Sequence, residues 1–309
     1  METTEQVELE QQALRARYQQ ALDDFIDLVR DDPNVIAVIV SGSVAYDVLW
    51  EKSDIDLTVV VRDQPLKNNS LCIVIDDITL NAALIPRSHF KRGVETAIGG
   101  SFFQSYLANG KFIYTTDESL DEYFEEIRQI GEDDIAQSML YLAGALLGTL
   151  HKVQKWLTAR KDPLYAQYFL LKAAEPVAEM ELCMRGLPTS RSAIQKAMAF
   201  NPELMQLLYQ EPMARHLTEA ELAERVQRLE RYLAGQMPLF QRPVVEYLAD
   251  GEIKTTSMIA KHFRTEGHFI VDVLDYLAEQ GVIDKVSQLV KLTPKSRQSV
   301  EEIGYLVMR

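Results

Sequence analysis

The sequence is poor in cysteine and in positive charge, and both shortages restrict what the protein can be. Its 309 residues include two cysteines, Cys72 and Cys183, so at most one disulfide and no cysteine-based metal cluster can form. Lys and Arg number 32 against 46 Asp and Glu, which gives a formal net charge of -14. An acidic chain is a poor general binder of nucleic acid and of anionic membranes. We therefore expect reduced thiols and a partner other than a bulk polyanion.

Long apolar runs are missing as well. No stretch approaches the roughly 20 residues that a membrane-spanning helix needs, and residues 1–12 are acidic and polar, unlike a signal peptide. We expect a cytoplasmic protein without a membrane partner. A hydrophobic fraction of 47% and a charged fraction of 25% indicate a globular chain with room for two or three domains.

The hydrophobic pattern changes character along the chain. Apolar residues at helical spacing predict a first helix over residues 7–30, which ends before Pro33. Short apolar runs then predict buried strands, and Asp76-Asp77 between two of them indicates a hairpin turn. From about residue 120 helical periodicity dominates, so we predict an α+β fold. The predicted strands are 35–40, 55–61, 71–75 and 78–85, and the longest predicted helices are 135–157 and 165–184.

The last 70 residues differ again and predict a small winged helix. Three short helices (243–248, 257–263 and 268–280) precede a hairpin that turns at Ser287-Gln288, with a final helix from about Lys295. We therefore divide the chain into residues 1–125, 126–238 and 239–309. Residues 241–309 hold 9 Lys and Arg against 10 Asp and Glu, so the charge favours dimerisation or a lid over a cleft at least as much as DNA binding.

The informative motif joins residues 40–43, Val-Ser-Gly-Ser, to residues 54–57, Asp-Ile-Asp-Leu. A glycine after a buried strand lets the backbone turn sharply and approach a ligand closely. Backbone amides and the Ser43 hydroxyl at the start of the next helix are suited to phosphate oxygens. The motif therefore predicts a phosphate cradle at Gly42 and Ser43.

The second half of the motif predicts a metal site. Asp54 and Asp56 alternate on a strand, so both carboxylates leave the same face. Their mutual repulsion is relieved by a divalent cation, and Mg²⁺ takes one or two protein carboxylates together with phosphate and water. Such a pair can activate an attacking oxygen and stabilise leaving pyrophosphate.

Gly42-Ser43 followed by Asp54-x-Asp56 in an apolar strand resembles the polymerase-β-like nucleotidyltransferase superfamily. Within the superfamily, the sequence most resembles the aminoglycoside and lincosamide nucleotidyltransferases. The resemblance covers about residues 15–125 and includes residues 110–114, Gly-Lys-Phe-Ile-Tyr, which read as a strand. It implies a mixed sheet, Mg²⁺ on Asp54 and Asp56, and a nucleoside triphosphate at Gly42 and Ser43. It further implies transfer of a nucleoside monophosphate to a hydroxyl of an acceptor. The acidic charge favours a small-molecule acceptor over nucleic acid, and a homodimer is compatible with the sequence.

One position departs from the family pattern. A third carboxylate is usual on a neighbouring strand, and Asn81 stands where it belongs. Asp77, four residues earlier at a turn, is too far along the strand to replace it. Two outcomes follow. Either Glu175, Glu179 or Glu181 of the helical region supplies a base, or the site binds a nucleotide without turning it over, as a regulator acting through the winged helix.

Overall fold

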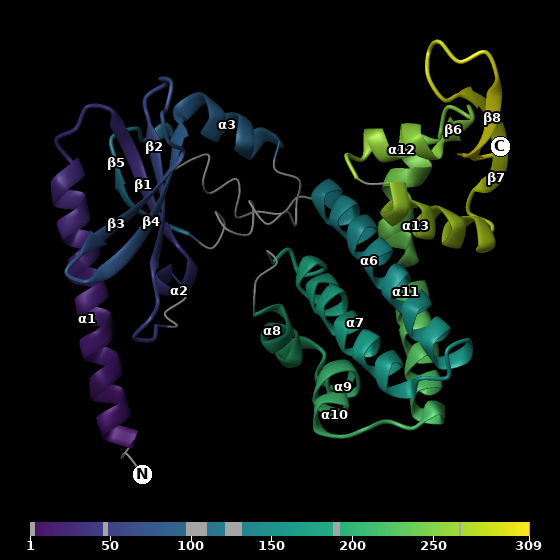
Figure 1. Ribbon diagram of the computed structural model, residues 1–309, viewed down its shortest axis with the longest axis horizontal. Coiled ribbons are helices and arrows are strands. Elements are labelled where there is room, and N and C mark those ends of the chain that lie inside the picture. Colours follow the sequence, from purple (N-terminus) through teal and green to yellow (C-terminus); the bar gives the residue numbers. More distant parts are fainter. Residues whose placement is uncertain are drawn as a thin grey trace. The chain divides into compact units, whose positions relative to one another are not determined.

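A computed structural model describes residues 4–45, 49–96, 110–120, 132–187, 192–265 and 267–308. The chain divides into two compact units, Met1–Ile130 and Gly131–Arg309. None of the described helices combines the length and the apolar character that crossing a membrane requires. Figure 1 labels the elements, and each unit is described by itself.

The first unit is built on a five-stranded mixed sheet. The strand order is β3-β4-β2-β1-β5, and only the β2–β4 pair is parallel. This confirms the predicted α+β fold with a mixed sheet. The strands are β1 (Val35–Ser41), β2 (Ile55–Val61), β3 (Ser70–Ile75), β4 (Ile78–Pro86) and β5 (Lys111–Thr115).

Alternate residues of the strands feed two separate cores. The long helix α1 (Thr4–Val29) packs on one face of the sheet, where Tyr18 and Phe25 join the odd-numbered residues of β2. On the other face, Phe90 of α3 (Arg87–Thr96) is fully buried with Ile39 and Val60. The even-numbered Asp56 shares this second face because successive strand residues point to opposite sides.

The β3–β4 hairpin turns where the sequence predicts, but β3 is not buried. Asp76 and Asp77 both have positive φ, +46° and +63°, as the central residues of a type I′ hairpin turn require. The prediction of a buried strand around Cys72 is wrong. Among the described strands β3 pairs only with β4, so it lies at the sheet edge and Cys72 is exposed.

The second unit is a helical bundle with a small sheet at its end. One continuous core runs from Met139 on the first helix to Tyr305 near the C-terminus. The helices are α6 (Glu132–Thr158), α7 (Pro163–Cys183), α8 (Ala193–Phe200), α9 (Pro202–Met205), η1 (Gln206–Gln210), α10 (Glu211–Ala214), α11 (Glu219–Tyr247), α12 (Thr256–His262) and α13 (Gly267–Glu279), and the strands are β6 (Lys254–Thr255), β7 (Asp284–Lys291) and β8 (Ser299–Leu306).

The C-terminal segment departs from the sequence prediction in three places. Residues 284–291 form one strand through Ser287-Gln288, so the hairpin turns later, between β7 and β8. The predicted final helix is wrong: residues 299–306 form β8, the middle strand of the β6-β8-β7 sheet, held by the buried Tyr305, which donates to Asp275 (2.6 Å). The predicted helix at 243–248 is the end of α11, which also crosses the predicted boundary at 238–239.

Two glycines let α13 lie directly against α6. A Cβ at Gly144 would stand 2.8 Å from the carbonyl oxygen of Phe269, and one at Gly148 would meet Asp272 at 3.1 Å. Four α13 side chains are buried: Ile270, Val273, Leu274 and Leu277. The helix is therefore packed into the body of the second unit.

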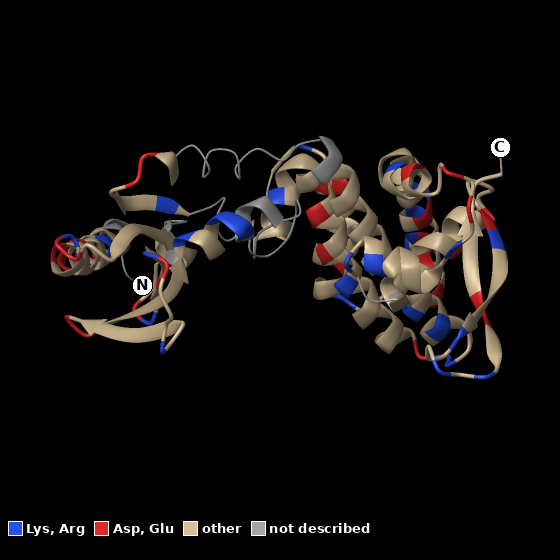
Figure 2. Ribbon diagram, turned by 90° about the horizontal axis from the view of Figure 1, so that it is seen from above, with Lys and Arg blue, Asp and Glu red and all other residues tan. Residues whose placement is uncertain are grey.

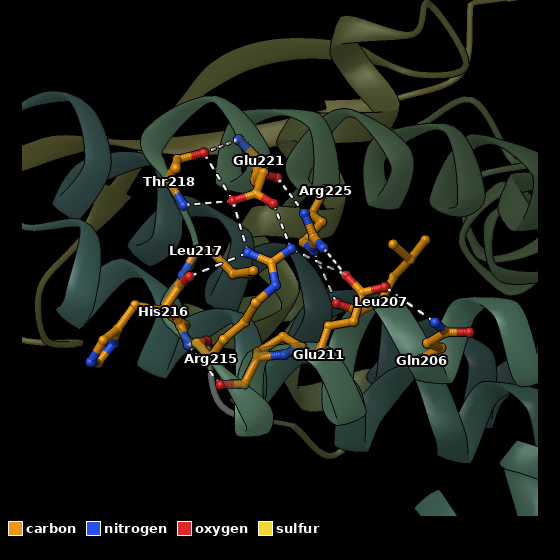
Figure 3. A network of polar contacts seen from close by, with 11 residues as sticks. Gln206, Leu207, Glu211, Arg215, His216, Leu217, Thr218, Glu221 and Arg225 are labelled. Atoms are coloured by element: carbon orange, nitrogen blue, oxygen red, sulfur yellow. Dashed lines mark hydrogen bonds and ion pairs between the residues drawn. The ribbon is translucent and has the colours of Figure 1, made fainter.

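A charged network fixes the start of α11 (Figure 3). Thr218 and Glu221 form a capping box, and Arg215 binds the Glu221 carboxylate with two nitrogens, at 2.5 and 3.1 Å. The buried Arg225 bonds to Glu211 and donates to the carbonyl of Leu207 (3.2 Å). The bonds from Arg215 and then Thr218 lower the pKa of Glu221 to about 2.

We predict that Glu221 makes the second unit acid-sensitive. Its folded pKa lies below the ordinary 4.5, so the stabilisation is complete above that value and is lost as the pH falls through about 2. Glu221→Gln should lower the melting temperature at neutral pH, with a difference from wild type that shrinks on acidification. Circular dichroism melts across this range measure it. The exposed Glu224→Gln on the same helix is the control, and an equal effect there would contradict the assignment.

Candidate active site

The site forms where β1 ends against the start of β2. Ser41 lies opposite Asp56 in the antiparallel β1–β2 register, and Gly42 follows with φ of +69°. A Cβ at Gly42 would stand only 2.4 Å from Oδ2 of Asp56. The backbone therefore reaches the carboxylate as closely as glycine alone allows.

Three polar side chains of neighbouring strands form a row on one face of the sheet. Asp56 lies opposite Ser41 on β1 and opposite Asn81 on β4. Residues paired across strands point to the same side, with strands about 4.8 Å apart. Asp56 and Asn81 are half-buried, and Ser41 is 1% exposed. The sequence thus placed Asn81 correctly beside the aspartate pair.

Asn81 bonds directly to the other motif aspartate. Its Nδ2 donates to Oδ2 of Asp54 at 2.5 Å. Asp54 is exposed and precedes β2, and Tyr18 of α1 donates to the carbonyl of the preceding residue, Ser53 (2.5 Å). The two aspartates and Asn81 therefore gather at one place, as the motif predicts.

The phosphate cradle is described only in part. The short helix α2 (Gly42–Ala45) starts at the predicted glycine. Ser43 belongs to its backbone, but the Ser43 side chain lies outside the described residues, as do residues 46–48. The predicted helix to residue 50 is described over α2 alone.

The residues present fit a magnesium ion that arrives with its nucleotide. Among the described residues, no three His, Cys, Asp or Glu side chains are arranged to hold a metal, so a tightly held resident ion has no donor set there. The two carboxylates match Mg²⁺, which takes one or two protein carboxylates and completes its shell with phosphate and water. The buried Ser41 Oγ, which has no hydrogen-bond partner among the described residues, adds a free polar group behind Asp56. Buried polar groups without a partner are rare and point to a missing ligand.

A pocket beside Asp54 holds two cations that the sequence analysis missed. It measures about 370 Å³ and is lined by Arg17, Lys52, Asp54 and Asp77, among others. Arg17 comes from the exposed side of α1 and Lys52 from the loop before β2. In the sequence, both residues look like ordinary exposed charges. Their proximity to Asp54 follows only from the fold, which brings α1 to this loop.

The basic residue Arg87, which begins α3 directly after β4, is not part of the group formed by Asp54, Asp56 and Asn81. Arg87 pairs with Asp117 at 2.6 Å and donates to Ser119. The hydrogen bonds from Ser119 and Arg87 lower the pKa of Asp117. This cluster follows the far end of β4, six residues beyond Asn81, so it supports the fold rather than the motif aspartates.

The three glutamates of α7 have different surroundings. Glu181 is buried and accepts bonds from Arg185, Asn201 and Tyr232 at 2.9 to 3.2 Å, so its role is structural. Glu175 is exposed. Burial and the charge of Glu175 raise the pKa of the half-buried Glu179 to about 7, which is the range a general base needs.

The sheet and its row of polar residues define a nucleotidyltransferase-like domain, and comparisons with known proteins agree. Residues 23–119 match the family described as "Polymerase beta, Nucleotidyltransferase". This part of the chain therefore belongs to the polymerase-β-like nucleotidyltransferase superfamily, which supports a role in nucleotidyl transfer.

The likeness extends beyond this domain as a shared fold. Eleven chains of solved structures match, among them a nucleotidyltransferase-like protein from Exiguobacterium sibiricum 255-15. That structure superimposes with a TM-score of 0.63 at 17% sequence identity, covering 94% of this chain and 100% of its own. No curated protein sequence matches the chain.

We predict that Gly42→Ala disrupts the site and its domain together. The added methyl would collide with Asp56, and the positive φ alone costs about 1–2 kcal/mol for other residues. The first unit should melt earlier, and Mn²⁺-nucleotide binding followed by electron paramagnetic resonance should weaken. Gly235→Ala is the matched control, since a Cβ there meets nothing within 4 Å and alanine favours a helix. If Gly42→Ala kept full affinity, the contact with Asp56 would have no role in binding.

Proposed function

We propose that the protein transfers a nucleoside monophosphate from a triphosphate to a hydroxyl group of a small acceptor and releases pyrophosphate. The observation that carries this proposal is the Asp56 carboxylate, which lies against the Gly42 backbone with Asp54 and Asn81 beside it. The superfamily match supports the reaction class, and the acidic composition supports the choice of a small acceptor over nucleic acid.

Each residue of the site has a part in the proposed reaction. Asp54 and Asp56 would hold Mg²⁺, and Gly42 with Ser43 would hold the triphosphate oxygens. When bound, the ion supplies positive charge that activates the attacking oxygen and stabilises the leaving pyrophosphate. Arg17 and Lys52 line the pocket beside Asp54 together with the acids Glu51, Asp54 and Asp77. With Mg²⁺ on the aspartates, the two cations would contact the anionic nucleotide.

The acceptor hydroxyl must lose a proton, and Asn81 cannot take it. An amide is neutral and has no basic group near pH 7. Of the three glutamates of the helical region that are candidates for this base, Glu179 has a pKa raised to about 7, the range in which a carboxylate is basic at neutral pH. Glu181 is not suited to this role, since three side chains already donate to it.

A regulator that reads DNA through its winged helix receives no support. A recognition helix needs an open face to enter the major groove. Among the described side chains of α13, only Gly267, Phe269 and Glu279 are exposed. None of the three is a cation, so the enzyme is the better supported function.

We predict that Asp56→Asn abolishes transfer while the fold is kept. Pyrophosphate release from a panel of triphosphates and acceptors should require Mg²⁺ and should fall roughly 100-fold or more in the variant, because the ion contributes several kcal/mol to such reactions. Asp63→Asn is the control: Asp63 accepts from the Ser88 backbone at 2.8 Å, after β2 ends. Turnover that survives Asp56→Asn would refute the proposed mechanism.

We predict that the rate depends on a group titrating near pH 7. The base must be deprotonated, so turnover should rise as the pH passes about 7. Glu179→Gln should remove this rise and lower the rate roughly 100-fold. Because the Glu175 charge helps to raise the Glu179 pKa, Glu175→Gln should move the rise to lower pH and keep the plateau rate.

A different result would place the base elsewhere. If Asn81→Asp accelerated transfer and Glu179→Gln left it unchanged, the first unit alone would hold the proton acceptor. Steady-state pyrophosphate release, measured across pH for all four proteins, separates these outcomes.

A further inference from the structure

An aromatic cluster lies where α6 ends and α7 begins. Trp156 meets Tyr165 edge-on with ring centroids 4.3 Å apart, and Tyr165, Tyr168 and Phe169 contact one another at 5.3 to 5.5 Å. Tyr165 and Tyr168 are 42% and 44% exposed. Exposed aromatic rings in contact with one another are unusual on a solvated helix face and mark interaction sites.

Cations surround this cluster and lie over its rings. Lys172 stands 5.0 Å from the Tyr168 ring, Lys152 lies 5.6 Å from Phe169, and Arg160 lies 5.9 Å from Trp156. We call the four aromatic residues and these three cations the aromatic–cationic patch. Each is within the distance at which a cation is attracted to a ring face.

The patch is a local reversal of the charge of the whole chain. Residues 151–172 contain five Lys and Arg and one acidic residue, a net of +4, in a chain of net -14. Within the described residues, Lys152, Arg160 and Lys172 form no ion pair. Most arginines of the same unit do pair with carboxylates, for example Arg215, Arg225 and Arg228. Figure 2 shows basic and acidic residues interleaved on helices of the second unit.

The hollow beside the exposed tyrosines of the patch is lined by no carboxylate. It measures about 490 Å³ and is lined by Leu164, Tyr165, Gln167, Tyr168 and Leu171. Gln167 is buried, and its amide is used inside the unit by Pro212, Arg215 and Leu217 at 2.6 to 2.9 Å. The hollow therefore offers ring and aliphatic surface, and Lys172 lies 5.0 Å from the ring of Tyr168, one of its lining residues.

We propose that the aromatic–cationic patch binds an anionic ligand that carries a flat ring, the chemistry of a nucleotide. Aromatic side chains that stack on bases, beside cations that bind phosphates, form the usual surface for a single strand. The same chemistry is present in a free mononucleotide. A polycationic sugar would be repelled by the five cations. All seven residues of this site belong to the second unit.

The test measures binding without turnover. A fluorescein-labelled single-stranded oligonucleotide of about ten nucleotides is titrated with the full chain in EDTA, and fluorescence anisotropy is followed. AMP and inorganic phosphate are the competitors. We expect saturable binding that weakens as salt rises. Displacement by AMP at concentrations near those of the oligonucleotide would assign the site to a mononucleotide, and displacement only at large excess would assign it to a strand.

Variants locate the binding. Tyr168→Ala should weaken it roughly tenfold, as one stacked base contributes about 1–3 kcal/mol. Lys172→Gln should weaken it and reduce the salt slope by about 0.7 for the lost phosphate contact. Lys295→Gln, an exposed lysine after β7, is the matched control and should bind as wild type. In a Trp50→Phe background, quenching of Trp156 fluorescence by unlabelled AMP or oligonucleotide gives a second readout.

Three results would overturn the proposal. One is no binding in low salt by the folded protein. Another is equal loss in Lys172→Gln and Lys295→Gln, which would indicate diffuse charge attraction. The third is a dimer on size exclusion that Tyr168→Ala converts to a monomer, since the patch would then be an interface between copies. Transfer activity plays no part in these measurements, so failure of the transferase mechanism leaves them interpretable.

Discussion

The close approach of the Gly42 backbone to the Asp56 carboxylate is the constraint on which the first unit depends. It exists because β1 and β2 pair antiparallel with Ser41 opposite Asp56, while β2 and β4 pair parallel with Asn81 opposite Asp56. The alternate residues Ile55, Leu57 and Val59 fill the core beneath α1. A slip of one residue would move these side chains to the opposite face of the sheet and turn Asp56 toward the core beneath α1. Packing therefore fixes the register that aligns the site.

Because core packing sets the strand register and the register aligns the site, the sequence predicts this part of the structure well. The β-branched runs of β1 and β2 are stable only as buried strands, so the sequence predicts the bounds of both strands to within one residue. The positions of the motif residues at the strand ends are predicted with them. Arg17 and Lys52 do not, because their relation to Asp54 depends on how α1 crosses the sheet. Cys72 was misjudged for a related reason: an apolar run predicts a strand but does not say whether another strand covers it. In β8, glutamates interrupt the apolar residues, so the sequence pattern does not indicate the strand that pairs with β7.

The second unit shows why a part that resembles a separate module in sequence need not act as one. α11 runs through the predicted boundary, the core is continuous to Tyr305, and Gly144 admits the α13 backbone against α6. Inserting a side chain at Gly144 would separate the two helices. The described charged residues of α13 are Asp272, Asp275 and Glu279, with no cation among them, which does not suit a helix that reads DNA. This leaves the exposed face of α7, with its tyrosines and Glu175, as the chemically distinctive surface of the unit.

Asn81 then decides how much the first unit can do alone. A third carboxylate beside Asp54 and Asp56 would both share the cation and accept the proton. The Asn81 amide contributes a hydrogen bond to Asp54 and adds no negative charge beside the two acids, and in the proposed reaction it would not accept the proton. In the proposed reaction, holding the nucleotide falls to the first unit, and removing the proton is a separate requirement that calls for a base with a pKa near neutrality. Glu179 has such a pKa because it is half-buried beside another carboxylate. The proposed reaction therefore divides into nucleotide binding, which Asn81 leaves intact, and proton removal, which Asn81 does not supply.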